Sequence, residues 1–212
     1  MMPLAAERLL RGEVAEAPSP RMCAAIAAIG AAVAGMALGG ASGEWRLAIY
    51  AAIKVPLLLA MATALCLPSF FVVNTILGLR DDFPAAVRAL LAAQAVLGIG
   101  LAAQAPVSVF LSASIADPYA LTLLDAVLFA TATWAGHQVL TRHYRLLIAR
   151  DARHRFALRG WLVLYAFAGV QMAWTLRPFR GTAGFAVQFL RPEALEQNAY
   201  VVLFEHVTRL LR

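Results

Sequence analysis

The stretch that decides the fold is "LAIYAAIKVPLLLAMATALCLPSFFVV", Leu47–Val73. Its only charged residue, Lys54, is also the only lysine among the 18 lysine and arginine residues of the chain. About 20 consecutive apolar residues are enough to cross the hydrocarbon core of a bilayer. The stretch therefore predicts a transmembrane helix, and it raises the question of what a single lysine does inside one.

Composition extends this prediction to the whole chain. Hydrophobic residues make up 62% of the 212 residues and charged residues only 14%, whereas a soluble domain is about half apolar and about a quarter charged. The net charge of +6 comes from arginines that lie in short segments between apolar runs. That pattern is typical of membrane topology rather than of a nucleic-acid-binding face. We expect a polytopic membrane protein whose partners are the lipid bilayer and other membrane subunits, with no nucleic acid.

The apolar runs predict an all-α transmembrane bundle of about five spans. They cover residues 23–41, 46–78, 84–113, 119–141 and 160–176. We expect a cytoplasmic tail over residues 1–21, the bundle over 22–176, and an outer-face reversal with an amphipathic helix over 177–212. The first run also fits a cleaved signal peptide, but its length favours an uncleaved helix.

The arginine distribution predicts the orientation. With the N-terminus inside, eleven arginines fall in inner segments and six in outer ones, and the loop after the fourth span, 142–159, carries six of the inner ones. Because positive residues are retained on the cytoplasmic side, we expect the N-terminus in the cytoplasm and the C-terminus in the periplasm. The alanine- and arginine-rich composition fits a bacterial inner membrane.

Lys54 and Asp125 form a candidate intramembrane polar pair. Each lies about two helical turns from the predicted outer face, on spans that run in the same direction, and Gln104 and Gln171 of the third and fifth spans could assist them. A lone charge in hydrocarbon is costly, so charges inside spans usually pair or line a transport path. The pair could be a structural clasp or an ion or proton site; alternatively, Lys54 snorkels to the outer headgroups.

Two further motifs are candidates for interaction. Small residues recur every four positions along the first span, a pattern that lets another helix approach closely: Ala27, Ala31, Gly35 and Gly39. "WTLRPFRG", Trp174–Gly181, ends the fifth span; its candidate outer-face interaction residues are Trp174, Arg177, Pro178 and Phe179. Pro178 is expected to stop the helix, and Arg177 could cap it or stack on Trp174 or Phe179.

The sequence contains no catalytic or metal-binding motif, so we assign no catalytic, cofactor-binding or metal-ligating residue. The four histidines are scattered, and Asp82 before Pro84 reads as a helix cap. Cys23 and Cys66 both lie in apolar runs and are expected to be buried thiols.

The chain resembles known proteins in its architecture, and this resemblance implies no activity. The pairing of K-x-P early in the second span with W-x-L-R-P-F after the last resembles uncharacterised bacterial polytopic membrane proteins. Five spans with a cytoplasmic tail are also similar to the architecture of the YIP family of trafficking proteins. We therefore expect a non-enzymatic inner-membrane subunit or scaffold. The alternatives are a small transporter that uses Lys54 and Asp125, and, with the weakest support, a lipid-modifying enzyme with its site near Arg177.

Overall fold

The computed structural model of the protein describes residues 18–181, 188–190 and 200. These residues form five long helices and one short 3-10 helix: α2 (Pro20–Gly40), α3 (Trp45–Ile76), η2 (Arg80–Asp82), α4 (Phe83–Ser114), α5 (Pro118–Arg150) and α6 (His154–Leu176). The described part contains no strand. The predicted bundle of about five helices is therefore confirmed, whereas the predicted N-terminal tail and C-terminal amphipathic helix lie almost entirely outside the described residues.

Four helical segments are long and apolar enough to cross a membrane: α2, α3, α6 and the run Arg80–Ser114 that contains η2 and α4. They correspond to four of the five predicted spans, and they make the chain an integral membrane protein. The remaining predicted span, the fourth at 119–141, is part of α5, which is as long as its neighbours at 33 residues but does not belong to this set. Polar residues such as Asp125, His137 and Gln138 along α5 lower its hydropathy.

The prediction that the basic segment 142–159 is a loop is wrong. α5 continues to Arg150 and α6 already begins at His154, so only residues 151–153 separate the two helices. Hydropathy identifies only the apolar part of a helix. Arginine and leucine have high helix propensity, so a helix can continue into a basic segment. α3 likewise continues through Pro56 and Pro68, and α4 through Pro106.

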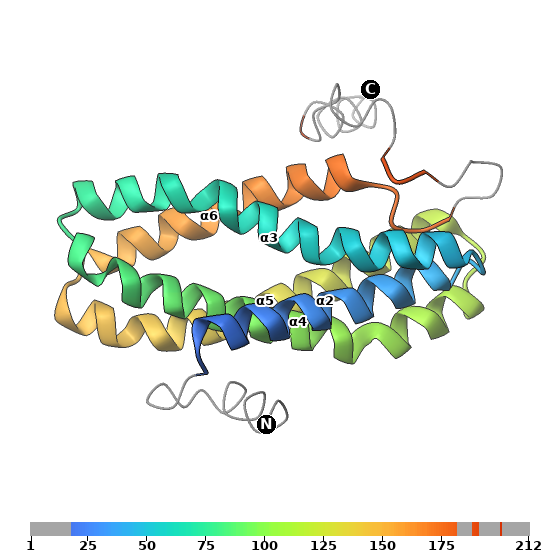
Figure 1. Cartoon of the computed structure of the whole chain (residues 1–212), viewed down its shortest axis with the longest axis horizontal. Coiled ribbons are helices and arrows are strands. Elements are labelled where there is room, and N and C mark those ends of the chain that lie inside the picture. The colour runs from blue at the N-terminus through green and yellow to red at the C-terminus, as the bar shows by residue number, and fades with distance from the viewer. Residues whose placement is uncertain (1–17, 182–187, 191–199, 201–212) are drawn as a thin grey trace.

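α2 is the wedge of the bundle, as Figure 1 shows. It packs against both α3 and α4, which make few direct contacts with each other, while α5 packs on α4 and α6 on α3. α2 has 21 residues, whereas α3 and α4 have 32 each. Because each helical residue advances about 1.5 Å, α2 covers only part of the length of its two neighbours.

Small residues allow this wedge to fit. A Cβ atom on Gly35 would collide with the backbone carbonyl of Ala51 in α3, and one on Gly98 in α4 would lie 2.7 Å from the carbonyl oxygen of Ala27. Close approach of this kind is how membrane helices gain packing energy, because lipid supplies no hydrophobic drive between them.

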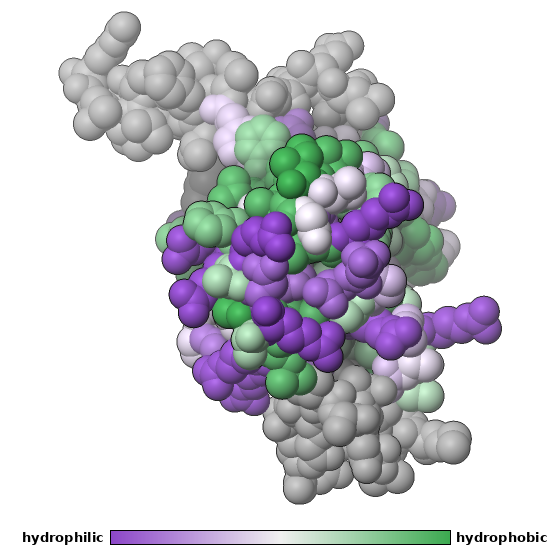
Figure 2. Space-filling view, turned by 90° about the vertical axis from the view of Figure 1, so that its left-hand side faces the viewer, coloured by the Kyte–Doolittle hydropathy of each residue, from purple (hydrophilic) through white to green (hydrophobic). Residues whose placement is uncertain are grey.

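The end of the bundle at which α3 and α5 finish, and α4 and α6 begin, carries most of the described arginines. We call it the arginine-rich end. Figure 2 looks onto it and shows hydrophilic residues spread across its surface. The exposed arginines there are Arg80, Arg88, Arg142, Arg145, Arg150, Arg153, Arg155 and Arg159. Beneath them lies a core cluster that includes Phe70, Tyr144 and Trp161.

Candidate functional site

The segment Arg177–Gly181 places the candidate site at the end of the bundle opposite the arginine-rich end. α6 stops at Leu176, which packs in one cluster with Val55 and Leu58 of α3. The chain then runs on without helix, and Gly181 lies against Ser42 and Leu47 at the α2–α3 turn. This return segment therefore continues along the bundle where α6 ends. Pro178, which has no backbone N–H and whose Arg177–Pro178 peptide is cis, lies two residues after the last helical residue, Leu176, close to where the helix was expected to stop.

Asp125 of α5 pairs with Arg180 of the return segment. The Arg180 guanidinium makes two contacts with the carboxylate, one from Nε to Oδ2 and one from Nη2 to Oδ1 at 2.7 Å. Such a two-point arginine–carboxylate pair is among the stronger charge-assisted contacts in proteins. The two side chains are only 17% and 15% exposed, so the pair is well removed from solvent.

Two serines of α4 complete this pair. Ser108 accepts a hydrogen bond from Nη2 of Arg180 at 2.8 Å and donates one to Oδ1 of Asp125 at 3.2 Å. Ser112 accepts from Nη1 of Arg180 and donates to the carbonyl of Ser108. We call Asp125, Arg180, Ser108 and Ser112 the clasp. Both hydroxyl protons are engaged with oxygen acceptors, that of Ser108 with the Asp125 carboxylate and that of Ser112 with a backbone carbonyl.

Lys54 of α3 lies in the same region and is completely buried. Its Nζ donates a hydrogen bond of 2.9 Å to the carbonyl oxygen of Pro178. The ring centroids of Phe179 and Phe189 lie 6.0 and 5.1 Å from Nζ, distances at which a cation is attracted to an aromatic face. Lys54 thus holds the return segment from the α3 side, while the clasp holds it from α4 and α5.

The predicted pair of Lys54 with Asp125 is therefore corrected. Both residues are at the predicted end of the bundle, but the ion-pair partner of Asp125 is Arg180, and Lys54 binds a carbonyl. Matching depth along the spans selected the wrong cation, because Arg180 enters the bundle from a non-helical segment. The snorkelling alternative is also excluded, since Lys54 is fully buried.

The two glutamines that were predicted to assist the pair lie in α4 and α6. Gln104 of α4 donates to the hydroxyl of Thr131 in α5 at 2.8 Å, a contact that links the same two helices as the clasp. Gln171 is in α6, where its backbone carbonyl accepts a hydrogen bond from the Thr175 hydroxyl.

The four motif residues lie at the end of α6 and directly after it. The Arg177 guanidinium stacks over the Trp174 ring at 3.4 Å from its centroid, one of the alternatives predicted from the sequence. Pro178 and Phe179 contact Lys54 as described above. The important residue of the motif, Arg180, was not singled out in the sequence, nor were Ser108 and Ser112. A usable signal existed: the two serines are four residues apart, so they share one face of α4.

The small-residue ridge of the first span lies inside the bundle. Ala27, Ala31, Gly35 and Gly39 are all buried. Gly35 and Gly39 face the carbonyls of Ala51 and Leu47 in α3, and Ala27 faces Gly98 in α4. The ridge therefore serves contacts within the chain.

A second set of polar contacts lies at the arginine-rich end. The buried ring of His154 lies with Nε2 3.0 Å from Oδ2 of Asp82, and Arg150 approaches the other carboxylate oxygen at 3.7 Å. The Asp82 side chain makes no cap hydrogen bond to α4, so the predicted capping role is wrong. It joins η2 to the α5–α6 turn instead.

In that turn, Asp151 accepts side-chain and backbone hydrogen bonds from Arg153. The side-chain hydrogen bond is the larger cause, and together they lower the pKa of Asp151 to about 2. Because the Arg153 side chain is 56% exposed and that of Asp151 29%, solvent screens this pair, which orders the turn without contributing much stability.

Within the described ranges, no three His, Cys, Asp or Glu side chains gather as a possible metal site. Comparison with known protein families, curated proteins and solved structures finds no match to the chain. The resemblance stated from the sequence therefore stays a prediction. What can be read from the site itself is an arrangement of charges that joins α3, α4 and α5 to the segment after α6.

Proposed function

We propose that the protein is a non-enzymatic integral membrane subunit, or scaffold, of a larger membrane assembly. The observation that carries this proposal is the use of its buried charges: Asp125, Arg180 and Lys54 all bind partners that tie helices to the return segment. Charged groups that are fully engaged in holding a bundle together stabilise a defined shape. A defined shape with large apolar faces toward the bilayer suits a protein that works by contact with other membrane subunits.

The proposed location is the bacterial inner membrane, with the N-terminus in the cytoplasm and the C-terminus in the periplasm. This orientation is supported by the arginine-rich end, where the exposed arginines of α4, α5 and α6 gather. Arginine in short segments near span ends favours retention on the cytoplasmic side. The return segment and the clasp then lie toward the periplasmic face.

The subunit proposal is tested by purifying the tagged chain in a mild detergent and in native lipid discs, followed by intact-complex mass analysis. We expect a particle heavier than the 22.7 kDa chain that contains another membrane polypeptide in fixed stoichiometry. The Arg180→Met variant is the matched comparison, since a damaged return segment should reduce recovery of the partner. A bare monomer from both preparations would contradict the proposal.

A second candidate is a small ion or solute transporter, and the burial of Lys54 favours it. A fully buried lysine near a buried carboxylate is the type of group that lines transport paths. Flux into liposomes is the measurement, with wild type, Lys54→Met and Asp125→Asn compared at equal protein content. Transport requires flux in wild type that both variants lose; flux that is absent, or equal in all three, removes this candidate.

A further inference from the structure

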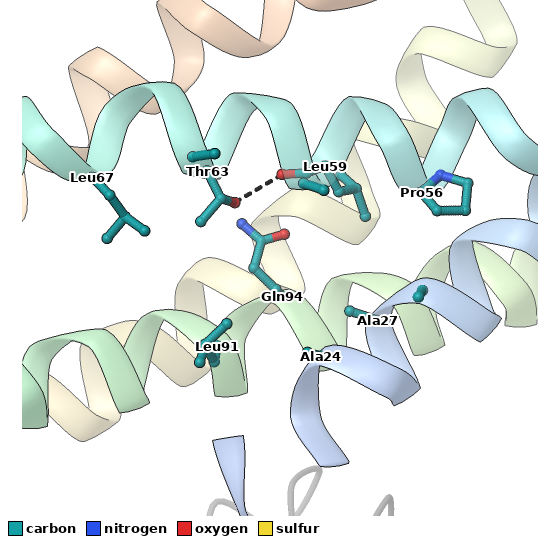
Figure 3. A pocket seen from close by; sticks show the side chains of 11 residues that line it. Ala24, Ala27, Pro56, Leu59, Thr63, Leu67, Leu91 and Gln94 are labelled. Atoms are coloured by element: carbon teal, nitrogen blue, oxygen red, sulfur yellow. Dashed lines mark hydrogen bonds between the residues drawn. The ribbon is translucent and has the colours of Figure 1, made fainter. Parts of the chain in front are cut away.

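A groove opens on the bundle surface between α2, α3 and α4, as seen from close by in Figure 3. Its volume is about 250 Å³. It lies beside the first turns of α2, where the wedge between α3 and α4 begins. The polar groups that line it are Thr63 and Gln94, which are separate from the clasp and from Lys54.

The groove has a narrow, small-residue rim and a buried floor. Ala28 of α2 and Ala60 and Ala64 of α3 are exposed at the rim, while Leu59 and Gln94 are buried below. All these residues belong to helical segments apolar enough to cross a membrane. An occupant of this groove therefore enters from the bilayer and is itself soluble in lipid.

Gln94 makes the groove more than an apolar surface. Its side chain is only 8% exposed, and Figure 3 shows its amide pointing into the space between Leu91 and Thr63. Its Oε1 accepts a hydrogen bond of 3.2 Å from the Tyr165 hydroxyl. Among the described residues, nothing accepts from its Nε2, and Thr63 gives its own proton to the Leu59 carbonyl. The amide thus presents N–H donors to the groove, and the other polar side chain that lines it, Thr63, makes no hydrogen bond with them.

The donors of the Gln94 amide favour an occupant that carries a hydrogen-bond acceptor. An N–H donor that faces hydrocarbon without an acceptor is unfavourable, and a hydrocarbon chain alone does not supply an acceptor. Sites for small ligands are typically apolar with a few placed polar groups.

We propose that the groove binds a membrane-soluble carbonyl compound, whose C=O oxygen accepts a hydrogen bond from Nε2 of Gln94. The carbonyl can belong to a quinone ring or to a lipid ester, which share the acceptor chemistry. This inference is independent of the proposed subunit function, because it concerns a different part of the bundle.

The test uses three probes with comparable alkyl tails on the full chain in lipid discs: decyl-benzoquinone, methyl undecanoate and decylbenzene, which has no carbonyl. Quinone binding is read from quenching of tryptophan fluorescence, since Trp161 stacks on Tyr165 with ring centroids 5.6 Å apart. The other two probes are measured by displacing the quinone. We expect at least one carbonyl probe to bind about tenfold more tightly than decylbenzene.

Substitutions distinguish the contribution of the Gln94 hydrogen bond from the contribution of the size of the groove. Gln94→Leu should remove the carbonyl preference, whereas Gln138→Leu, a matched change at an exposed position on α5, should leave it intact. Ala60→Leu narrows the groove at its exposed rim and should weaken all binding. The tighter of the two carbonyl probes identifies a quinone or an ester as the source.

Equal binding of decylbenzene and both carbonyl probes would overturn the proposal and leave ordinary acyl chains as the occupant. Unchanged probe binding in Gln94→Leu would overturn it as well. Should Gln94→Leu fail to fold, Ala60→Leu decides: unchanged binding there also overturns the proposal.

Discussion

At the residue scale, the clasp is the feature with the largest expected effect. Replacing Arg180 by Met leaves Asp125 buried without its cation, and replacing Asp125 by Leu leaves the guanidinium without its anion. Removal of one partner of a buried pair costs about 3–5 kcal/mol. We expect each single variant to melt well below wild type, and the double variant to recover much of the loss. The measurement is the fraction of folded protein by size exclusion after heating.

The same experiment distinguishes Arg180 from Lys54 as the partner of Asp125. Lys54→Met removes the charge-assisted hydrogen bond to the Pro178 carbonyl, and a bond of this kind is worth about 1.5–3 kcal/mol. Because Lys54 and Asp125 both act on the return segment, the loss in the Lys54→Met/Asp125→Leu double variant should be at most the sum of the two single losses, with no recovery relative to either single variant. Rescue in that double variant would contradict the assignment and favour direct pairing of Lys54 with Asp125.

Asp151 provides the exposed counterpart to this buried pair. Its pKa is lowered to about 2 by Arg153, against about 3.9 in an unfolded chain. A lowered pKa stabilises the folded state above pH 4 and loses this effect as the pH falls from about 4 to about 2. We expect Asp151→Asn to lower the melting temperature slightly at pH 6, with the difference from wild type vanishing near pH 2. A difference that grows on acidification would contradict this sign.

At the element scale, the wedge of α2 depends on residues without side chains. Gly35→Ala places a methyl group against the Ala51 carbonyl of α3, and overpacking of this kind costs about 1–3 kcal/mol. Gly169 of α6 has nothing within 4 Å of its Cβ position, so Gly169→Ala should be neutral or stabilise by up to about 1 kcal/mol. Heating in detergent compares the two variants, and equal behaviour would argue against tight α2–α3 packing.

At the scale of the whole molecule, the proposed orientation is open to sided labelling. Cys23 and Cys66 are buried thiols and can be replaced by alanine to give a background without cysteine. Arg155→Cys then marks the arginine-rich end, and Glu44→Cys marks the opposite end, since both positions are exposed. In intact cells, a membrane-impermeant maleimide should label Glu44→Cys and spare Arg155→Cys. The reverse pattern would place the arginine-rich end outside.

The sequence by itself determined the membrane class, the bundle of about five long helices in the described part of the chain, and the small-residue face of α2. Each of these depends on a property that accumulates locally along the chain. Runs of apolar residues such as 47–73 specify spans, because the bilayer sets the length of an apolar helix. The four-residue spacing of Ala27, Ala31, Gly35 and Gly39 specifies one helix face, because successive turns stack these positions.

Only the tertiary structure decided which charges meet. Lys54 was predicted as the ion-pair partner of Asp125 because the two residues lie at similar depth on helices that run in the same direction. That prediction did not consider the segment after the last helix. α6 ends beside Val55 and Leu58, and the return segment then carries Arg180 to Asp125, 55 positions earlier in the chain. The groove at Gln94 likewise exists because α2 is shorter than the two helices that it separates. Contacts of this range depend on where a helix stops in space, which hydropathy does not specify.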